Sequence, residues 1–554
     1  MSTTASSSSA SGPGHRLTRR LGIVGLLFAS VGSIIGSGWL FGAMQAASAT
    51  GPSAILSWAI GGVMIAFIGL VYAELGSMFP IAGGVVRFPH LAFGSFASFV
   101  GGWTTWVAAA TTAPIEVEGA LQYATRYADF TRTKTVNGAQ VHTLTGWGFV
   151  AAVVLMALFV VINYIGIAWF ARVNNILVVW KLAMITLVVV AFLLTTFHGA
   201  NLSDHGFFAH GAQGVFSAVA TSGIVFSYLG FRQAIELAGE GSRPKRDIPL
   251  AVIGSLLVTA VLYVLLQLAF LVAVDPGRLA AHGWDNVADT LTNSAGPLAS
   301  IASTIGLGWL AVLLYIDAVV SPGDTGLIYT TTAARMSYAM GRNGNAPAAL
   351  ARTTGRGAPW VSLAVAFVVG LIAFLPFPSW QQLVGFITSA TVLSFGSGPL
   401  VLGALRRRLP ERERPFRVPS GDLLPILGFV SSNLIVYWTG WTTNWKLFLA
   451  IVLGIVLYAV HETFGKDTPP RELAAGATWV VPWLAGLAVL SYVGDFTGGR
   501  GWVAFWPAIA LVAVFSVAIY YLAVRQALPA EKIHGHVTKA ERDTEDDDEV
   551  FAGG

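Results

Sequence analysis

The chain has 554 residues, of which 55% are hydrophobic and 11% are charged, and its mean hydropathy is +0.68. Soluble domains carry about 25% charged residues, so this composition predicts an all-α membrane protein. The net charge of +4 is too small to suggest a nucleic-acid partner, and the lack of cysteine excludes disulfides, thiol catalysis and cysteine-ligated metals.

Polar segments flank a long apolar region. Residues 1–20 are Ser-rich and lack the apolar core of a signal peptide, which predicts a disordered cytoplasmic tail. Residues 525–554, with the run ERDTEDDDE, are predicted to form a second, acidic tail. Apolar runs of about 20 residues predict about fourteen membrane spans between the tails. The spans are expected near 21–48, 53–78, 95–125, 147–169, 173–197, 214–238, 248–274, 298–322, 359–376, 381–404, 424–441, 444–462, 474–495 and 502–524, with 323–345 continuing the eighth as a cytoplasmic helix.

Basic residues predict the orientation, since short cytoplasmic loops of membrane proteins carry an excess of lysine and arginine. With the N-terminus inside, the run RRRLPERERPFR lies in a cytoplasmic loop at 405–423. Of the 32 lysines and arginines, the expected outer segments hold only Arg126, Arg132, Lys134, Arg278, Lys446 and Arg500. We therefore predict a multi-pass protein of the cell membrane with both termini in the cytoplasm.

Two of the predicted spans are interrupted by small polar residues. The first contains GSIIGSGWL at Gly32–Leu40, and the sixth contains Thr221-Ser222-Gly223. Glycine costs about 1 kcal/mol relative to alanine in a helix interior, and freed backbone groups find no water in lipid. Breaks at corresponding positions of two five-span halves are typical of inverted-repeat transporters, which bind substrate between the broken helices. The alternative is that these glycines only allow neighbouring helices to approach closely.

Four ordered motifs resemble the amino acid–polyamine–organocation (APC) superfamily. They are GSIIGSGWLFG, YAELGSMFPIAGG, GFRQAIELAGEGSRPKRDIPLAV and RMSYAMGRNGNAP. The resemblance implies a leucine-transporter-like core of ten helices in a 5+5 inverted repeat at 21–404, with helices one and six broken, and four accessory helices at 424–524. GGVVRFPH, at Gly83–His90, resembles the aspartate–proton symporter branch of that superfamily.

The resemblance also implies a substrate site at the two breaks. The residues that match the family's first-helix site are Ser33, Ile34, Gly36, Ser37 and Gly38. Unwound N–H groups at the start of a half-helix suit a carboxylate, so Ser37 and Gly38 are expected to hold the substrate's α-carboxylate. Carbonyls released around Ser222, Gly223 and Phe226 suit the ammonium group. Phe226 stands where the family places an aromatic gate, although it could also be an ordinary packing residue.

Arg232 follows the second break within the sixth span, where many members of the superfamily carry glutamate. A charge at the bilayer centre costs about 2.5–3.5 kcal/mol on insertion scales, so it usually faces a cavity or a partner. The guanidinium is suited to gripping a second carboxylate on the substrate side chain. The alternative is a structural ion pair with Glu116, Glu118 or Asp317.

Lys181 is the predicted proton-coupling residue. It lies about eight residues into the fifth span, roughly 12 Å from the inner end at 1.5 Å per residue. Proton-coupled members of the superfamily have a lysine in the matching stretch, facing the first helix. A lysine at this depth could instead extend its stem towards the cytoplasm. The alternative carriers or ion-pair partners are the carboxylates Glu116, Glu118, Asp317 and Asp324.

These residues favour a secondary active transporter that takes up an acidic amino acid, such as aspartate or glutamate, by alternating access with protons. The alternatives are an exchanger of neutral or other amino acids and a receptor that binds an amino acid without moving it. No nucleophile–base pair indicates an enzyme, and no cofactor beyond the coupling proton is expected. The spacing of His198, His205 and His210 fits no standard zinc site, so no metal is expected either. The expected partners are the amino acid and the lipid bilayer, while the oligomeric state stays open.

Overall fold

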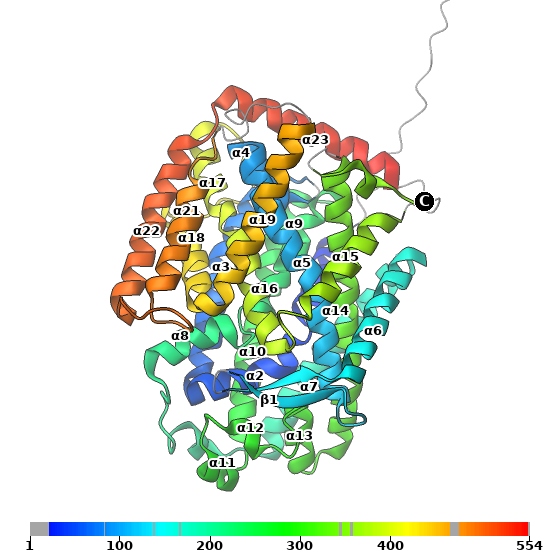
Figure 1. Ribbon diagram of the computed structural model, residues 1–554, viewed down its shortest axis with the longest axis vertical. Coiled ribbons are helices and arrows are strands. Elements are labelled where there is room, and N and C mark those ends of the chain that lie inside the picture. Colours follow the sequence, from blue (N-terminus) through cyan, green and yellow to red (C-terminus); the bar gives the residue numbers. More distant parts are fainter. Residues whose placement is uncertain are drawn as a thin grey trace, which may run out of the picture.

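The computed structural model describes residues 21–81, 83–136, 139–165, 168–342, 346–354, 358–465 and 476–551 (Figure 1). The predicted tail at 1–20 lies outside these ranges. The described chain is helical apart from one antiparallel hairpin, in which β1 (Thr131–Val136) pairs with β2 (Ala139–Leu144) and Thr131 lies opposite Leu144.

The helices follow the chain in two groups. The first group is α1 (Ile23–Ile34), α2 (Gly38–Thr50), α3 (Ala54–Met78), α4 (Gly84–Phe93), α5 (Ser95–Ala124), α6 (Gly146–Ile165), α7 (Ala168–Thr195), α8 (Gly211–Thr221), the 3₁₀ helix η3 (Phe226–Arg232), α9 (Gln233–Glu236) and α10 (Pro244–Ala273). The second is α11 (Pro276–His282), α12 (Val287–Thr290), α13 (Pro297–Thr304), α14 (Gly308–Arg342), α15 (Trp360–Ala373), α16 (Trp380–Phe395), α17 (Ser397–Arg408), α18 (Leu423–Trp438), α19 (Trp441–Gly465), α21 (Val480–Val493), α22 (Phe505–Gln526) and α23 (Ala530–Phe551). Short 3₁₀ turns connect several of them.

The apolar helices identify a multi-pass membrane protein. Within the described ranges, eight helical stretches are long and apolar enough to cross a bilayer, and the bent pair α8 with η3–α9 makes up to nine. Four shorter apolar helices, α1, α15, α18 and α21, add to these. The total of fourteen spans and the 5+5 repeat stay predictions. The eighth span begins later than expected, because α13 is a separate short helix, and α14 then continues without a break to Arg342.

Both predicted helix breaks are present. α1 ends at Ile34 and α2 begins at Gly38, because Ile35 leaves the helical region with φ −89° and ψ 89°. α8 ends at Thr221, and the helix resumes at Phe226 with a bend of 46°. Gly223 has φ +87°, a left-handed conformation that favours glycine at this position.

The two broken helices also touch through their backbones. A methyl group added at Gly230 in η3 would overlap the backbone of Ser33 and Ile34 in α1. One added at Gly38 in α2 would overlap the Ser227 hydroxyl group. Glycine therefore serves close helix approach here as well as helix interruption, so the two explanations of the motifs do not exclude each other.

The two ends of the molecule carry different elements. In the view of Figure 1, the hairpin and α11–α13 lie at the lower end, and α4, α17 and α23 lie at the upper end. The accessory helices α18, α21 and α22 flank one side of the bundle. The helical core lies between these ends and contains both breaks.

The C-terminal segment differs from the prediction of a disordered tail at 525–554. Helix α23 occupies Ala530–Phe551, and its side chains at Ile533, Val537 and Ala540 are buried. This spacing places three apolar residues on one helical face, which packs beside α4. The prediction of disorder followed from the acidic run after this short apolar stripe.

Candidate transport site

Glu116 of α5 occupies the first helix break. The Ser37 N–H donates to Glu116 Oε2 at 2.7 Å, and the Glu116 side chain is only 1% exposed. A methyl group at Gly36 would lie 2.6 Å from Oε1, so glycine allows the carboxyl group to lie against the backbone. The N–H predicted to hold the substrate's carboxylate therefore holds a carboxylate of the protein in this structure.

Trp380, at the start of α16, joins the two breaks. Its Nε1–H donates to Ser37 Oγ at 2.8 Å, and a methyl group at Gly223 would lie 2.8 Å from its ring. Phe226 meets the same ring edge-on, with the ring centroids 6.3 Å apart. The sequence analysis missed Trp380, because a tryptophan at the start of a span is indistinguishable in sequence from an interfacial one.

Some of the backbone groups around the second break already make hydrogen bonds within the protein. The Gly223 carbonyl accepts hydrogen bonds from the Ser227 N–H at 2.9 Å and from the Ser227 hydroxyl at 2.7 Å. The Ser222 hydroxyl donates to the Gln45 carbonyl of α2 at 3.2 Å. Ser37, Gly38, Gly223 and Phe226 thus gather around Trp380 and Ser227, and Gly36 lies against Glu116. Ser33 and Ile34 are not part of this group, because their backbone contacts Gly230 of η3 instead.

Lys181 of α7 points towards the first break. Its Nζ lies 2.6 Å from Asp324 Oδ2 and donates to the Gly32 carbonyl at 2.8 Å and to Thr325 Oγ1 at 3.2 Å. Both charged side chains are fully buried. An extension of the lysine towards the cytoplasm is excluded, because the ammonium group bridges α1 and α14 inside the bundle.

The remaining candidate carboxylates are buried as well. Asp317 Oδ1 accepts from Trp180 Nε1–H at 2.8 Å and from the Ser321 hydroxyl at 2.7 Å. Glu118 is 3% exposed, and neither of its carboxylate oxygens has a hydrogen-bond partner among the described residues.

Arg232 is buried, with an exposed fraction of 1%. Its Nε lies 3.4 Å from Glu236 Oε1, one helical turn along the chain, and its guanidinium lies 5.1 Å from the centroid of the Tyr329 ring. Its charge partner is thus Glu236 rather than Glu116, Glu118 or Asp317. Within the described ranges, the three guanidinium nitrogens make no hydrogen bond, so Arg232 retains donors for a ligand.

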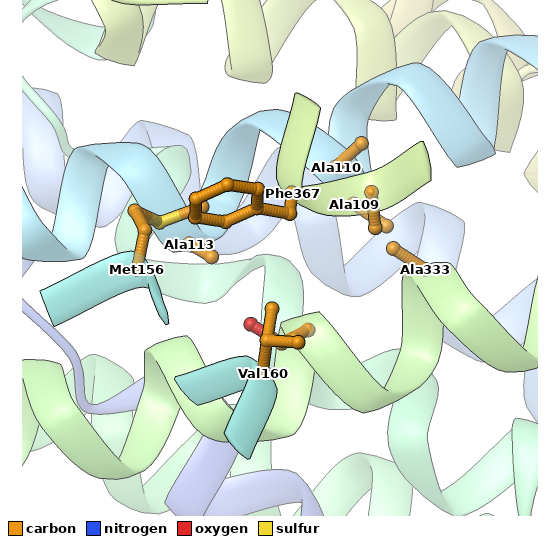
Figure 2. Close-up of a pocket in the computed structure, with 9 residues that line it drawn as sticks. Ala109, Ala110, Ala113, Met156, Val160, Ala333 and Phe367 are labelled. Carbon is orange, nitrogen blue, oxygen red and sulfur yellow. The ribbon is translucent and has the colours of Figure 1, made fainter. Parts of the chain in front are cut away.

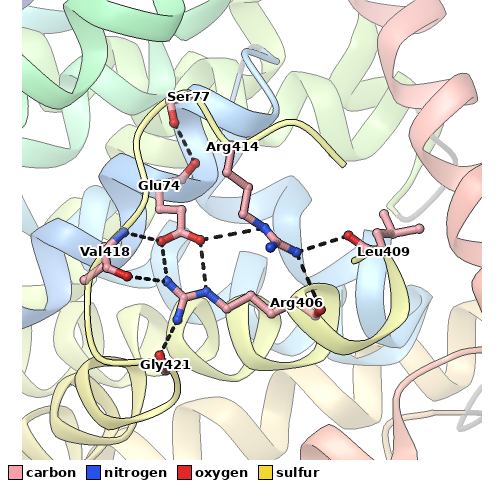
Figure 3. Close-up of polar contacts among 7 residues, drawn as sticks. All are labelled: Glu74, Ser77, Arg406, Leu409, Arg414, Val418 and Gly421. Carbon is pink, nitrogen blue, oxygen red and sulfur yellow. Dashed lines mark hydrogen bonds and ion pairs between the residues drawn. The ribbon is translucent and has the colours of Figure 1, made fainter. Parts of the chain in front are cut away.

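A second buried charge cluster lies at the end that carries α4 (Figure 3). Glu74 of α3 accepts a hydrogen bond from Arg406 Nε at Oε1, at 3.0 Å. At Oε2 it accepts from the Val418 N–H, at 2.7 Å, and from Arg406 Nη2. Arg414 Nε lies 4.0 Å from the same carboxylate. Partial burial lowers the pKa of Arg414, and the charge of Glu74 opposes this shift. The cluster ties the basic loop between α17 and α18 to the end of α3.

The apolar cavity in Figure 2 is separate from these groups. Ala109 and Ala113 of α5, Met156 of α6, Ala333 of α14 and Phe367 of α15 line it. None of the predicted substrate residues contributes to its wall, and its apolar lining offers no charged group to an amino acid.

Two interrupted helices that cross beside buried lysine, arginine and carboxylate groups define a membrane transporter of the broken-helix class. Comparison with known proteins then identifies the family. The profile of the amino acid permease family matches residues 21–526, so the chain belongs to that family within the APC superfamily. It is an amino acid transporter and not an enzyme.

Several relatives match over most of the chain. The glutamate/serine transporter AimA of Bacillus subtilis (strain 168) is 37% identical over 525 residues, which cover 93% of this chain and 95% of the relative. The aspartate-proton symporter of the same organism is 34% identical over 523 residues, covering 93% and 98%. Its branched-chain amino acid permease BcaP is 26% identical over 460 residues, covering 80% and 93%.

Proposed function

We propose that this protein takes up an acidic amino acid, aspartate or glutamate, together with protons by alternating access. The observation that carries the proposal is the contact of the buried Lys181 ammonium group with both Asp324 and the Gly32 carbonyl. The similarity to two relatives, a glutamate/serine transporter and an aspartate-proton symporter, supports the choice of substrate. We further propose that it resides in the cell membrane with both termini in the cytoplasm.

Proton coupling follows from what Lys181 bridges. The protonated ammonium group joins α7 to the carbonyl end of α1 and to Asp324 of α14. A neutral amine would lose the charge attraction to Asp324 and weaken the bond to Gly32. Proton release at Lys181 would therefore weaken the attachment of α1 to α7 and α14.

The choice of an acidic substrate rests on Arg232. An anionic side chain in a low-dielectric site needs a nearby cation, since an unpaired buried charge costs several kcal/mol. Arg232 lies in η3 directly after the second break and has donors without hydrogen bonds in the described chain. Lys181 is already engaged by Asp324 and Gly32.

The test is uptake of radiolabelled aspartate and glutamate by the purified protein in liposomes, with and without an imposed pH gradient. We expect accumulation only when the outside is acidic. Counterflow without a gradient but no net accumulation would instead indicate an exchanger, and binding without uptake would indicate a receptor.

Variants at Arg232 test the substrate choice. Arg232→Ala should raise the KM for aspartate by about one to two orders of magnitude, because a charge-assisted hydrogen bond contributes roughly 1.5–3 kcal/mol. Arg232→Lys should restore affinity only in part, since the fork geometry is lost. Glu236→Gln removes the internal partner and should leave the KM close to that of the wild type. A preference of the wild type for neutral or cationic amino acids would reduce Arg232 to a structural partner of Glu236.

A further inference from the structure

Glu116 and Glu74 are both buried carboxylates that accept a backbone N–H, but only one of them is fully bonded. Glu74 has hydrogen-bond donors at both oxygens. Glu116 accepts from Ser37 at Oε2, whereas its Oε1 has no hydrogen-bond partner in the part of the chain that the structure describes. A carboxylate that served only to hold the break closed would be expected to have both oxygens satisfied.

The place that Glu116 occupies suits a substrate carboxylate. Ser37 is the N-cap of α2, where backbone N–H groups and the helix dipole favour a negative charge. Every α-amino acid brings a carboxylate to the site. Two carboxylates cannot share one N–H donor, because their charges repel strongly in a low-dielectric interior.

We propose that Glu116 is a tethered mimic of the substrate's α-carboxylate. It binds the Ser37 N–H when the site is empty, and the arriving amino acid must displace it. The displaced carboxylate takes up one proton from the side on which the substrate enters. It returns that proton when it binds Ser37 again after the substrate has left. The proposal rests on amino acid transport, and it requires neither an acidic side chain nor a proton on Lys181.

The surroundings of Glu116 supply both signs of charge. Lys181 of α7 and Asp324 of α14 act on it through their charges. Tyr263 of α10 and Tyr329 of α14 are the neighbouring titratable hydroxyl groups. Protonation of Glu116 weakens its hold on Ser37, because a neutral acceptor makes a hydrogen bond about half as strong as an ionised one. Substrate affinity should therefore rise as the pH falls.

Glu116→Gln tests the competition, because glutamine keeps the shape and removes the charge. The measurement is calorimetric binding of L-glutamate and L-serine, each compared with its α-amide, between about pH 5.5 and pH 8. For both amino acids, the variant should bind about three- to tenfold more tightly than the wild type near pH 8, with a flatter pH dependence. The α-amides lack the competing carboxylate, so their affinities should not change.

Two further variants keep the test decisive. Thr112 lies one turn before Glu116 on α5, and its hydroxyl donates to the Ala108 carbonyl of the same helix. Thr112→Val is therefore the control and should not change the affinity for amino acids. Glu116→Asp keeps the charge but withdraws the carboxyl group by one methylene, so it should also tighten binding if Glu116→Gln fails to fold.

The outcomes separate this proposal from the proposed function. Equal or weaker amino acid binding in the folded Glu116 variants would overturn the competition and make Glu116 a structural support of the break. If L-serine shows the predicted gain but acidic amino acids are not transported, the competition stands and the acidic substrate is wrong.

Discussion

Two buried clusters of charge in this protein are built differently. Around Glu74, the carboxylate has arginine or backbone donors at both oxygens, and Arg406 also donates to the Val418 carbonyl at 3.0 Å. Around the helix breaks, several buried charged atoms have no hydrogen bond in the described ranges. These atoms belong to Glu116, Glu118, Arg232, Glu236 and Asp317 and to Asp324 at Oδ1, whereas beside Glu74 only Arg414 Nε is of this kind among the described residues.

We interpret this difference as one between charges with a structural role and charges that take part in transport. A buried polar atom without a partner costs about 1–3 kcal/mol, and more if it is charged. Such a cost persists where a ligand or a proton uses the group during the working cycle. We therefore expect substitutions in the central cluster to change transport and substitutions around Glu74 to change stability.

The largest effect is expected at Lys181. Lys181→Ala should abolish accumulation driven by an imposed pH gradient, because Gly32 and Asp324 lose their shared cation. Lys181→Gln should leave at most uncoupled exchange, since an amide can donate to Gly32 but carries no proton between the two sides. Uptake into liposomes at matched protein density measures both.

Lys245→Ala is the matched control for the Lys181 variants. Lys245 Nζ lies 2.6 Å from Glu413 Oε2, but both side chains are more than half exposed. Exposed pairs contribute about 0–1 kcal/mol, so uptake should be unaffected. Undiminished uphill uptake by both Lys181 variants would move the coupling role to one of the central carboxylates.

The next largest effect is expected from a substitution at Gly230, where η3 contacts the backbone of α1. Gly230→Ala places a methyl group on the backbone of Ser33 and Ile34, which cannot retreat without moving α1. We expect loss of transport and a lower melting temperature. Gly385→Ala in α16 is the control, because its methyl group would meet Thr443 at an ordinary 3.5 Å. Equal activity of the two variants would show that α1 and η3 do not need this close approach.

Glu74→Gln should affect stability and not affinity. Breaking a buried ion pair costs about 3–5 kcal/mol, and Glu74 is fully buried against Arg406. We expect a clearly lower melting temperature with an unchanged substrate KM. Glu413→Gln, which breaks the exposed pair with Lys245, should leave the melting temperature nearly unchanged. A raised KM in Glu74→Gln at normal stability would contradict the division between the two clusters.

The sequence predicted what depends on local composition. Small residues interrupt the two helices at the expected positions, and Lys181 contacts α1, as the resemblance to the superfamily implied. It could not predict contacts between distant helices. Glu116 contacts Ser37 across 79 positions and Trp380 contacts it across 343, and no pattern within α5 or α16 predicts either contact.

Short apolar stripes in polar segments were also missed. The acidic composition of the C-terminal segment predicts disorder, yet Ile533, Val537 and Ala540 of α23 are buried in the structure. Arg232 shows the same limit for charges. Its partner Glu236 is four residues away on the same helical face, a spacing that supports ion pairs, whereas the predicted partners lie in other spans.

The smallest effect concerns the docking of α23, at the end opposite the hairpin. The His536 ring stacks on His90 of α4 with centroids 4.5 Å apart, and its Nδ1 lies 3.1 Å from the His90 carbonyl oxygen. His536→Ala removes both contacts and should speed amide hydrogen exchange in residues 530–540 by roughly fivefold, as expected for a net loss of about 1 kcal/mol. His534→Ala is the matched control, since the Nδ1 atom of His534 contacts the Ala530 carbonyl of its own helix. Both substitutions change helix propensity equally, so a difference in exchange between them reports the contact with α4. Transport should be unchanged in both, because the described helix contacts of α23 are with α4 and not with the broken helices. If the two variants exchange at the same rate, the apolar face at Ile533 and Val537 holds the helix without help from the histidine pair.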